Sequence, residues 1–258
     1  KVVPNTMDLV AGQLSKELNA ANEQEVKLII GLIVKRGFVD TGNCKIYADL
    51  AYCLICDVPK FKPNIRWEPL HVQSVLGDIV QAEYASIQAS LASGSSEEPS
   101  QQDTEQRCQS DMQEAHIAAL RFIGHLFIRE LMIPSIVLQI VEGLLCPATV
   151  LPSGAVPSGA EPEEHNVECL SRLLLLIGPT LEHLPAGKAV LARTCNAFRA
   201  LVGQMREDGH AVYGKRAKFA MRDVLNSRLK GWPASPSVAG QRGRGRGQGV
   251  PRTGGLRR

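Results

Sequence analysis

Cysteine and histidine are the side chains in this chain best suited to metal binding or nucleophilic chemistry, and their spacing decides whether they form a site. Cys53 and Cys56 form the sequence "CLIC", the spacing of half a zinc site. They lie within an apolar helical pattern and no second pair follows, so we interpret them as structural thiols. The chain has seven cysteines, several of them within apolar runs. An odd number of cysteines in such places indicates reduced, buried thiols in a cytoplasmic or nuclear protein.

The histidines do not combine with other ligands in sequence. His116 and His125 lie on one predicted helix, but nine residues separate them, so they share a face only loosely. Another group of potential ligands lies further along the chain and consists of Glu163, Glu164, His165 and Cys169. This second group has no supporting second half. We therefore expect no metal and no cofactor, and we interpret these histidines as core or surface residues.

Sequence signatures of enzymes are missing. The chain contains no phosphate-binding loop ending in Gly-Lys-Ser/Thr, no Gly-x-Ser-x-Gly and no His-Glu-x-x-His. We predict a protein without catalytic residues, which acts by binding and is not an enzyme.

The charge of the chain is unevenly distributed. The net charge is +3, yet residues 233–258 contain six arginines and no acid. Residues 1–232 are left with 23 basic and 26 acidic side chains. A mildly acidic body is a poor electrostatic footprint for nucleic acid, although a local patch could still bind it.

The basic tail contains the sequence "QRGRGRGQG", with Arg242, Arg244 and Arg246. It has too few apolar residues to form a core, so we expect it to be disordered. Arg-Gly segments bind single-stranded RNA through phosphate contacts and guanidinium stacking. The tail therefore either binds mRNA or only aids solubility.

Helical periodicity recurs along the body of the chain and predicts an all-α fold. Helices are expected at about 6–18, 23–37, 44–55, 70–91, 112–131, 134–145, 163–178, 186–205 and 213–230. We expect a flexible loop at 93–107 and a mobile inserted loop at 147–162. The longest apolar run, at 173–177, is too short to span a bilayer. Helix pairs recur every 40–50 residues, the spacing of HEAT-type repeats.

Three stretches of the chain resemble the middle domain of eukaryotic translation initiation factor 4 gamma. They are "RFIGHLFIRELMIPSIVLQIVEGLL" (121–145), "NVECLSRLLLLIGPTLE" (166–182) and "KRAKFAMRDVLNSRLKGW" (215–232). The resemblance covers most of residues 5–232 and implies a HEAT-repeat solenoid of about five antiparallel helix pairs, followed by the disordered Arg-Gly tail at 233–258. It also implies an activity: binding and activating the DEAD-box RNA helicase initiation factor 4A during cap-dependent recruitment of mRNA.

The resemblance also sets limits. The tyrosine motif that binds the cap-binding protein is absent, so that partner would bind only through regions outside this sequence, which begins with Lys and is interpreted as a fragment. A cytoplasmic location and no membrane contact are implied. The alternatives are a related HEAT scaffold of mRNA decay or nuclear RNA processing that binds another DEAD-box helicase, and an RNA-binding module driven by the tail.

The candidate helicase contacts lie at both ends of the body. At the C-terminal end they are Lys215, Lys218, Phe219, Arg222 and Arg228. Their basic side chains face water, a helicase lobe or RNA phosphates, and Phe219 either packs in its own repeat or is offered to a partner. At the N-terminal end, Val3, Pro4 and Met7 either contact the helicase or cap the first repeat. Trp232 either fastens the last helical turn, which we favour, or marks a contact site.

Overall fold

The structure is a computed structural model, which describes residues 6–20, 23–57, 69–93, 102–145, 162–205 and 210–232. The described residues form nine α-helices and one isolated bridge between Met205 and Ala211. The helices are α1 (Met7–Ala20), α2 (Glu23–Val39), α3 (Cys44–Asp57), α4 (Pro69–Ser93), α5 (Gln102–Ile128), α6 (Pro134–Leu145), α7 (Glu164–Glu182), α8 (Pro185–Gly203) and α9 (Lys215–Leu229). The predicted all-α class is confirmed.

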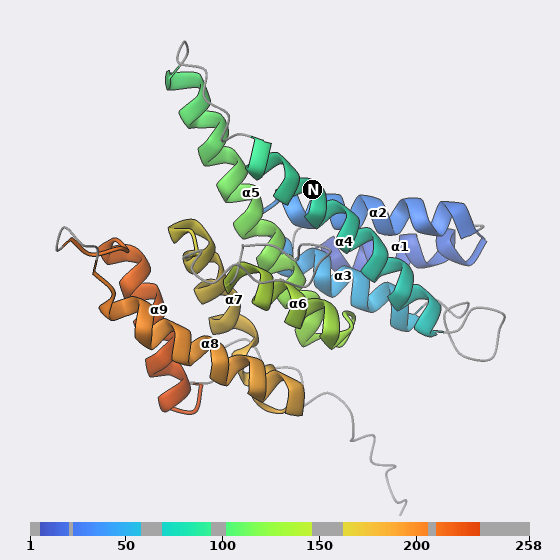
Figure 1. Ribbon diagram of the computed structural model, residues 1–258. Helices are drawn as coiled ribbons and strands as arrows, with labels where there is room; N and C mark the ends of the chain where they lie inside the picture. The colour runs from blue at the N-terminus through green and yellow to red at the C-terminus, as the bar shows by residue number, and fades with distance from the viewer. Residues whose placement is uncertain are drawn as a thin grey trace, which may run out of the picture.

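The helices are arranged in two layers that follow the chain. In one layer α1 contacts α3, α3 contacts α5, α5 contacts α7 and α7 contacts α9. On the other side α2 packs on α4, and α6 packs on α8. Figure 1 shows α1–α4 at one end and α8 and α9 at the other, with α5 and α7 between them. This is the layout of a HEAT-type solenoid, in which each helix pair buries its apolar side against its neighbours.

Helix boundaries follow local sequence signals. Pro69, Pro134 and Pro185 each stand at the first position of a helix, where a missing N–H costs nothing. At the end of α9, Gly231 adopts a φ of 72° and the Trp232 amide donates to the Ser227 carbonyl oxygen at 2.7 Å. A left-handed glycine after the last turn is a common helix stop.

The prediction of a flexible loop at 93–107 is wrong at both of its ends. Helix α4 continues to Ser93, and α5 begins at Gln102. The stretch "QDTEQR" has few apolar residues, but Gln, Glu and Arg favour the helix, so polarity alone did not indicate a loop. Most of the loop expected at 147–162 lies outside the described residues.

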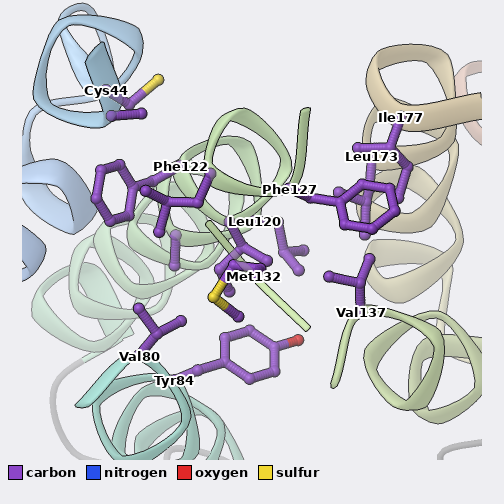
Figure 2. Packing of buried hydrophobic residues seen from close by; sticks show 14 of the residues in the cluster. Cys44, Val80, Tyr84, Leu120, Phe122, Phe127, Met132, Val137, Leu173 and Ile177 are labelled. Atoms are coloured by element: carbon purple, nitrogen blue, oxygen red, sulfur yellow. The ribbon is translucent and has the colours of Figure 1, made fainter. Parts of the chain in front are cut away.

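The core is continuous, and α5 lies at its centre. In Figure 2 Phe122 and Leu120 of α5 lie between residues of α3 and α4 on one side and Leu173 and Ile177 of α7 on the other. Phe122 is fully buried and meets Phe38 edge-on at 5.7 Å between ring centroids. A side chain at Gly37 would clash with the Phe122 ring at 2.5 Å, so this glycine is what allows α2 to approach α5 closely.

Candidate partner-binding surfaces

One arc of α9 is exposed, and it combines cations with large apolar side chains. At 100° per residue its members share one face. They are Lys215, Phe219, Arg222, Asn226 and Leu229, called here the α9 surface. Phe219 is 62% exposed and Leu229 is 78% exposed. Lys215 and Arg222 form no ion pair with any described residue.

The structure resolves one alternative left open by the sequence and corrects one placement. The sequence left open whether Phe219 packs in its own repeat or is offered to a partner. The side chain is exposed, so it does not pack in its own repeat. Grouping by apolar type alone places Leu229 with the buried Ala217, Met221 and Val224, but it is exposed because at 100° per residue it lies on the same arc as Lys215 and Arg222. Lys218 is half-buried, at the border of the α9 surface.

Arg228, predicted as a helicase contact, has intramolecular partners. Its guanidinium donates to the Glu182 carboxylate at 3.2 Å and to the Leu191 carbonyl oxygen at 3.4 Å. Burial alone would raise the pKa of Glu182, but hydrogen bonds from Arg228 and Trp232 outweigh burial and lower it. Arg228 therefore holds α9 against α7 and α8.

Trp232 completes this anchor. Its ring lies directly over Gly178 of α7, where an added Cβ would meet the ring at 2.4 Å. Its indole N–H faces Glu182 Oε2 at 3.4 Å. Trp232 has a φ of 56°, which is unusual for a bulky residue, and the packed ring holds it there. The expected fastening role is confirmed, but the ring fastens α9 to α7.

A second exposed surface lies on α2, where sequence reasoning predicted no contact. Leu28, Leu32, Lys35 and Val39 fall within one arc of the helix and are called here the α2 surface. Leu28 is 65%, Leu32 56% and Val39 76% exposed. Lys35 pairs with Glu83 of α4 at 3.3 Å, so its charge is partly compensated. The signal was in the sequence, because α2 carries more apolar residues than one buried face can use.

The remaining predicted contacts divide into two groups. Met7 is half-buried at the start of α1, and its place leaves both interpretations of it open. Val3, Pro4, Arg242, Arg244 and Arg246 lie outside the described residues, so the contacts assigned to them stay predictions.

The potential metal ligands come together in a way that sequence spacing did not indicate. His116 of α5 meets His165 and Cys169 of α7, and together they form a cluster within the described residues. Burial lowers the pKa of His116 to about 4 and raises that of Cys169 to about 12. The Glu163–Cys169 group lacked a further ligand from elsewhere in the sequence. In the structure His116, 49 residues before His165, lies in that place.

Comparison with known proteins agrees with the fold. No protein-family model matches the chain. It is 22% identical over 245 residues to eukaryotic translation initiation factor 4 gamma 3 of mouse and of human, which covers 90% of the chain but 14% of the length of those relatives.

A solved structure gives the same answer at the level of the fold. The MIF4G domain of translation initiation factor EIF4G5 from Trypanosoma cruzi superposes with a TM-score of 0.56 at 16% identity, over 90% of this chain and 92% of that domain. The described helices therefore have the MIF4G fold, a HEAT-type arrangement, and the resemblance to the middle domain of initiation factor 4 gamma is confirmed. No described helix is both long enough and apolar enough to cross a membrane.

Proposed function

We propose that this MIF4G-type chain is a scaffold that binds and activates a DEAD-box RNA helicase of the initiation factor 4A class in translation initiation. The observation that carries the proposal is the pair of exposed surfaces at opposite ends of the solenoid. The α2 surface is apolar, and the α9 surface mixes cations with Phe219 and Leu229. Exposed apolar side chains in such groups are typical of protein-binding sites.

A DEAD-box helicase has two lobes, and a scaffold with one contact surface at each end can hold both. A ligand that binds one arrangement of the lobes better than the others shifts the helicase toward that arrangement. The scaffold then speeds ATP hydrolysis without contributing a catalytic residue. Lys215, Lys218, Phe219 and Arg222 would contact one lobe, and Val3, Pro4 and Met7 with the α2 surface would contact the other.

Arg228 has a supporting part in this proposal. Its guanidinium is engaged by Glu182 and Leu191, so it orients α9 and does not reach toward a partner. The mRNA contact is assigned to Arg242, Arg244 and Arg246 of the tail, where binding through phosphates weakens steeply with salt.

The test uses the purified chain, initiation factor 4A and a single-stranded RNA. We expect the chain and the helicase to co-elute in gel filtration and RNA-dependent ATP hydrolysis to rise when the chain is added. A chain that neither co-elutes nor accelerates hydrolysis would refute the proposal. Stronger binding to a DEAD-box helicase of mRNA decay or nuclear processing, in the same assay, would assign the scaffold to that process.

A variant lacking residues 233–258 separates the two binding functions. We expect it to bind RNA weakly but to bind the helicase like the full chain. Equal loss of both activities would contradict the division of labour between body and tail.

A further inference from the structure

The cluster of His116, His165 and Cys169 joins two helices at the centre of the solenoid. His165 and Cys169 are four residues apart, so they lie on one face of α7, and His116 reaches them from α5. His116 and Cys169 are each only 1% exposed, whereas His165 is half-buried. Two imidazoles and a thiol meet here, and among the described residues only Ser171 and Thr194 are polar and buried to the same degree as His116.

The three ligand atoms are spaced like three corners of a zinc tetrahedron. The His116 Nδ1 atom lies 3.1 Å from His165 Nε2. The Cys169 Sγ atom lies 3.4 Å from His165 Nε2 and 3.9 Å from His116 Nδ1. Zn–N bonds of about 2.0–2.1 Å and Zn–S bonds of about 2.3 Å give tetrahedral edges of roughly 3.3 Å between two nitrogens and roughly 3.6 Å between nitrogen and sulfur.

A further contact fixes the orientation of one ligand. The Tyr84 hydroxyl of α4 lies 3.0 Å from His116 Nε2, the ring nitrogen that points away from the cluster. If Nε2 carries the proton and donates to Tyr84 Oη, then Nδ1 presents its lone pair to the other two ligands. Such a second hydrogen bond on a metal-binding imidazole is the usual way in which its tautomer is set.

We propose that His116 Nδ1, His165 Nε2 and Cys169 Sγ form a zinc-binding site that ties α5 to α7. Imidazole and thiolate are the ligands that zinc binds in tetrahedral sites. A water molecule would complete the tetrahedron. Binding releases the thiol proton of Cys169, and no electron is transferred. The site is independent of the helicase proposal.

Charges around the site balance in part. Arg172 and Arg216 lie near His165 and oppose a cation there, while Glu168 lies near Cys169 and favours it. Arg216 is drawn toward Glu168, whose carboxylate it pairs with at 3.0 Å. The Cys169 thiolate supplies the negative charge that the bound ion needs. Because α5 also packs on α2, α3 and α4, the ion would connect the two halves of the solenoid through one helix.

The first test measures the wild-type chain, so it does not depend on any variant folding. The chain is stripped with a chelator and titrated with Zn²⁺, and metal content and melting temperature are followed. We expect one equivalent to remain bound after desalting and the melting temperature to rise with Zn²⁺ concentration. With Co²⁺ we expect thiolate-to-cobalt charge transfer and the intense visible bands of tetrahedral coordination. A chain that retains no metal and does not change its melting temperature overturns the proposal.

Variants then assign the ligands. We expect His165→Gln and Cys169→Ala to lower zinc affinity by more than about a hundredfold, and Tyr84→Phe to lower it about ten- to hundredfold. Two variants serve as controls. One is His183→Gln, at an exposed histidine directly after α7, and the other is Cys195→Ala, at a buried cysteine of α8. Both controls should bind zinc like the wild type.

The pair Cys53 and Cys56 on α3 provides the sharpest counter-test, because two cysteines at this spacing form one half of many zinc sites. The double variant Cys53→Ala/Cys56→Ala should keep its bound zinc. Zinc that is lost from this variant and kept by Cys169→Ala would overturn the proposal.

Discussion

The two exposed surfaces of the solenoid differ in chemistry although both lie on single helices at the ends of the fold. The α2 surface is apolar, and Lys35, its one cation, already pairs with Glu83. The α9 surface carries Lys215 and Arg222 beside Phe219, and neither cation pairs with a described residue. The comparison suggests that the two ends would bind a partner by different forces, hydrophobic at α2 and largely electrostatic at α9.

The two ends also differ in how they are held. Helix α2 packs on α3, α4 and α5, mostly through apolar side chains. Helix α9 depends in addition on a polar anchor, in which Arg228 and Trp232 both reach Glu182. A single substitution in this polar anchor can therefore shift the α9 surface, although the substituted residue is not part of that surface.

The largest effect is expected from reversing charge at the α9 end. Lys218→Glu/Arg222→Glu should weaken helicase binding about 30- to 150-fold at low salt, equivalent to about 2–3 kcal/mol, because it replaces attraction by repulsion. Calorimetry at two ionic strengths checks this, and the loss should shrink as salt rises. Arg199→Glu, on the exposed side of α8, is the control and should bind normally. Binding unchanged by the double variant would place the contact elsewhere.

The second effect concerns the anchor of α9. Trp232→Ala removes a half-buried ring from α7 and should lower the free energy of unfolding by about 2 kcal/mol. Gly178→Ala should act in the same direction, because its Cβ would lie 2.4 Å from the Trp232 ring. Urea denaturation measures both. We also expect both variants to weaken helicase binding at the α9 end and to leave the contribution of the α2 surface intact. If both variants unfold at the same urea concentration as the wild type, the Trp232 ring does not anchor α9.

A smaller loss is expected at the α2 end. Leu28→Ala/Leu32→Ala should weaken helicase binding about tenfold, because truncation removes apolar area but alanine keeps the helix. The salt dependence of binding should stay that of the wild type, in contrast to the α9 variants. Leu175→Ala, an exposed leucine of α7, is the matched control. A changed salt slope in the α2 variant would break the proposed contrast.

The last effect appears only on acidification and concerns the central helix that both ends share. Burial, together with the nearby Arg129, Arg121 and Lys45, lowers the pKa of His125 on α5 to about 4, against about 6.5 when unfolded. The unfolded chain then binds more protons between these values, so stability is full above pH 6.5 and falls as pH drops toward 4. Melting curves from pH 7.5 to 4.5 check this. His125→Gln should reduce the dependence and leave the part that comes from His116, whose pKa burial also lowers to about 4. An unchanged slope in that variant would exclude His125 as a source.

The sequence predicted most of the helices because their apolar residues recur at helical spacing. The boundaries of α6, begun by Pro134, and of α9, stopped by Gly231, followed from residues with strong local preferences. The start of α5 was missed because residues 102–107 are polar, and polarity does not separate a helix from a loop.

The sites were less predictable because they depend on contacts between distant segments. His116 joins His165 only through the packing of α5 on α7, and no spacing in the sequence indicates that pairing. The α2 surface was missed for a related reason. Sequence alone assigns apolar residues such as Leu28 and Leu32 to the core, and only the positions of the neighbouring helices show that they are exposed. Phe219, in contrast, stood out beside cations in the polar arc, and the sequence alone offered its exposure as one of two interpretations.

The central claim is that the α2 end and the α9 end bind the same helicase molecule. The rate of ATP hydrolysis, measured when all of the helicase is bound by the chain, tests this claim most directly. RNA-dependent ATP hydrolysis by initiation factor 4A is measured with enough of the Lys218→Glu/Arg222→Glu chain to occupy all the helicase, next to wild type and Arg199→Glu. The account predicts that the double variant, bound through its α2 end alone, gives little acceleration while both other chains give full acceleration. Full acceleration by the double variant at saturation would contradict it.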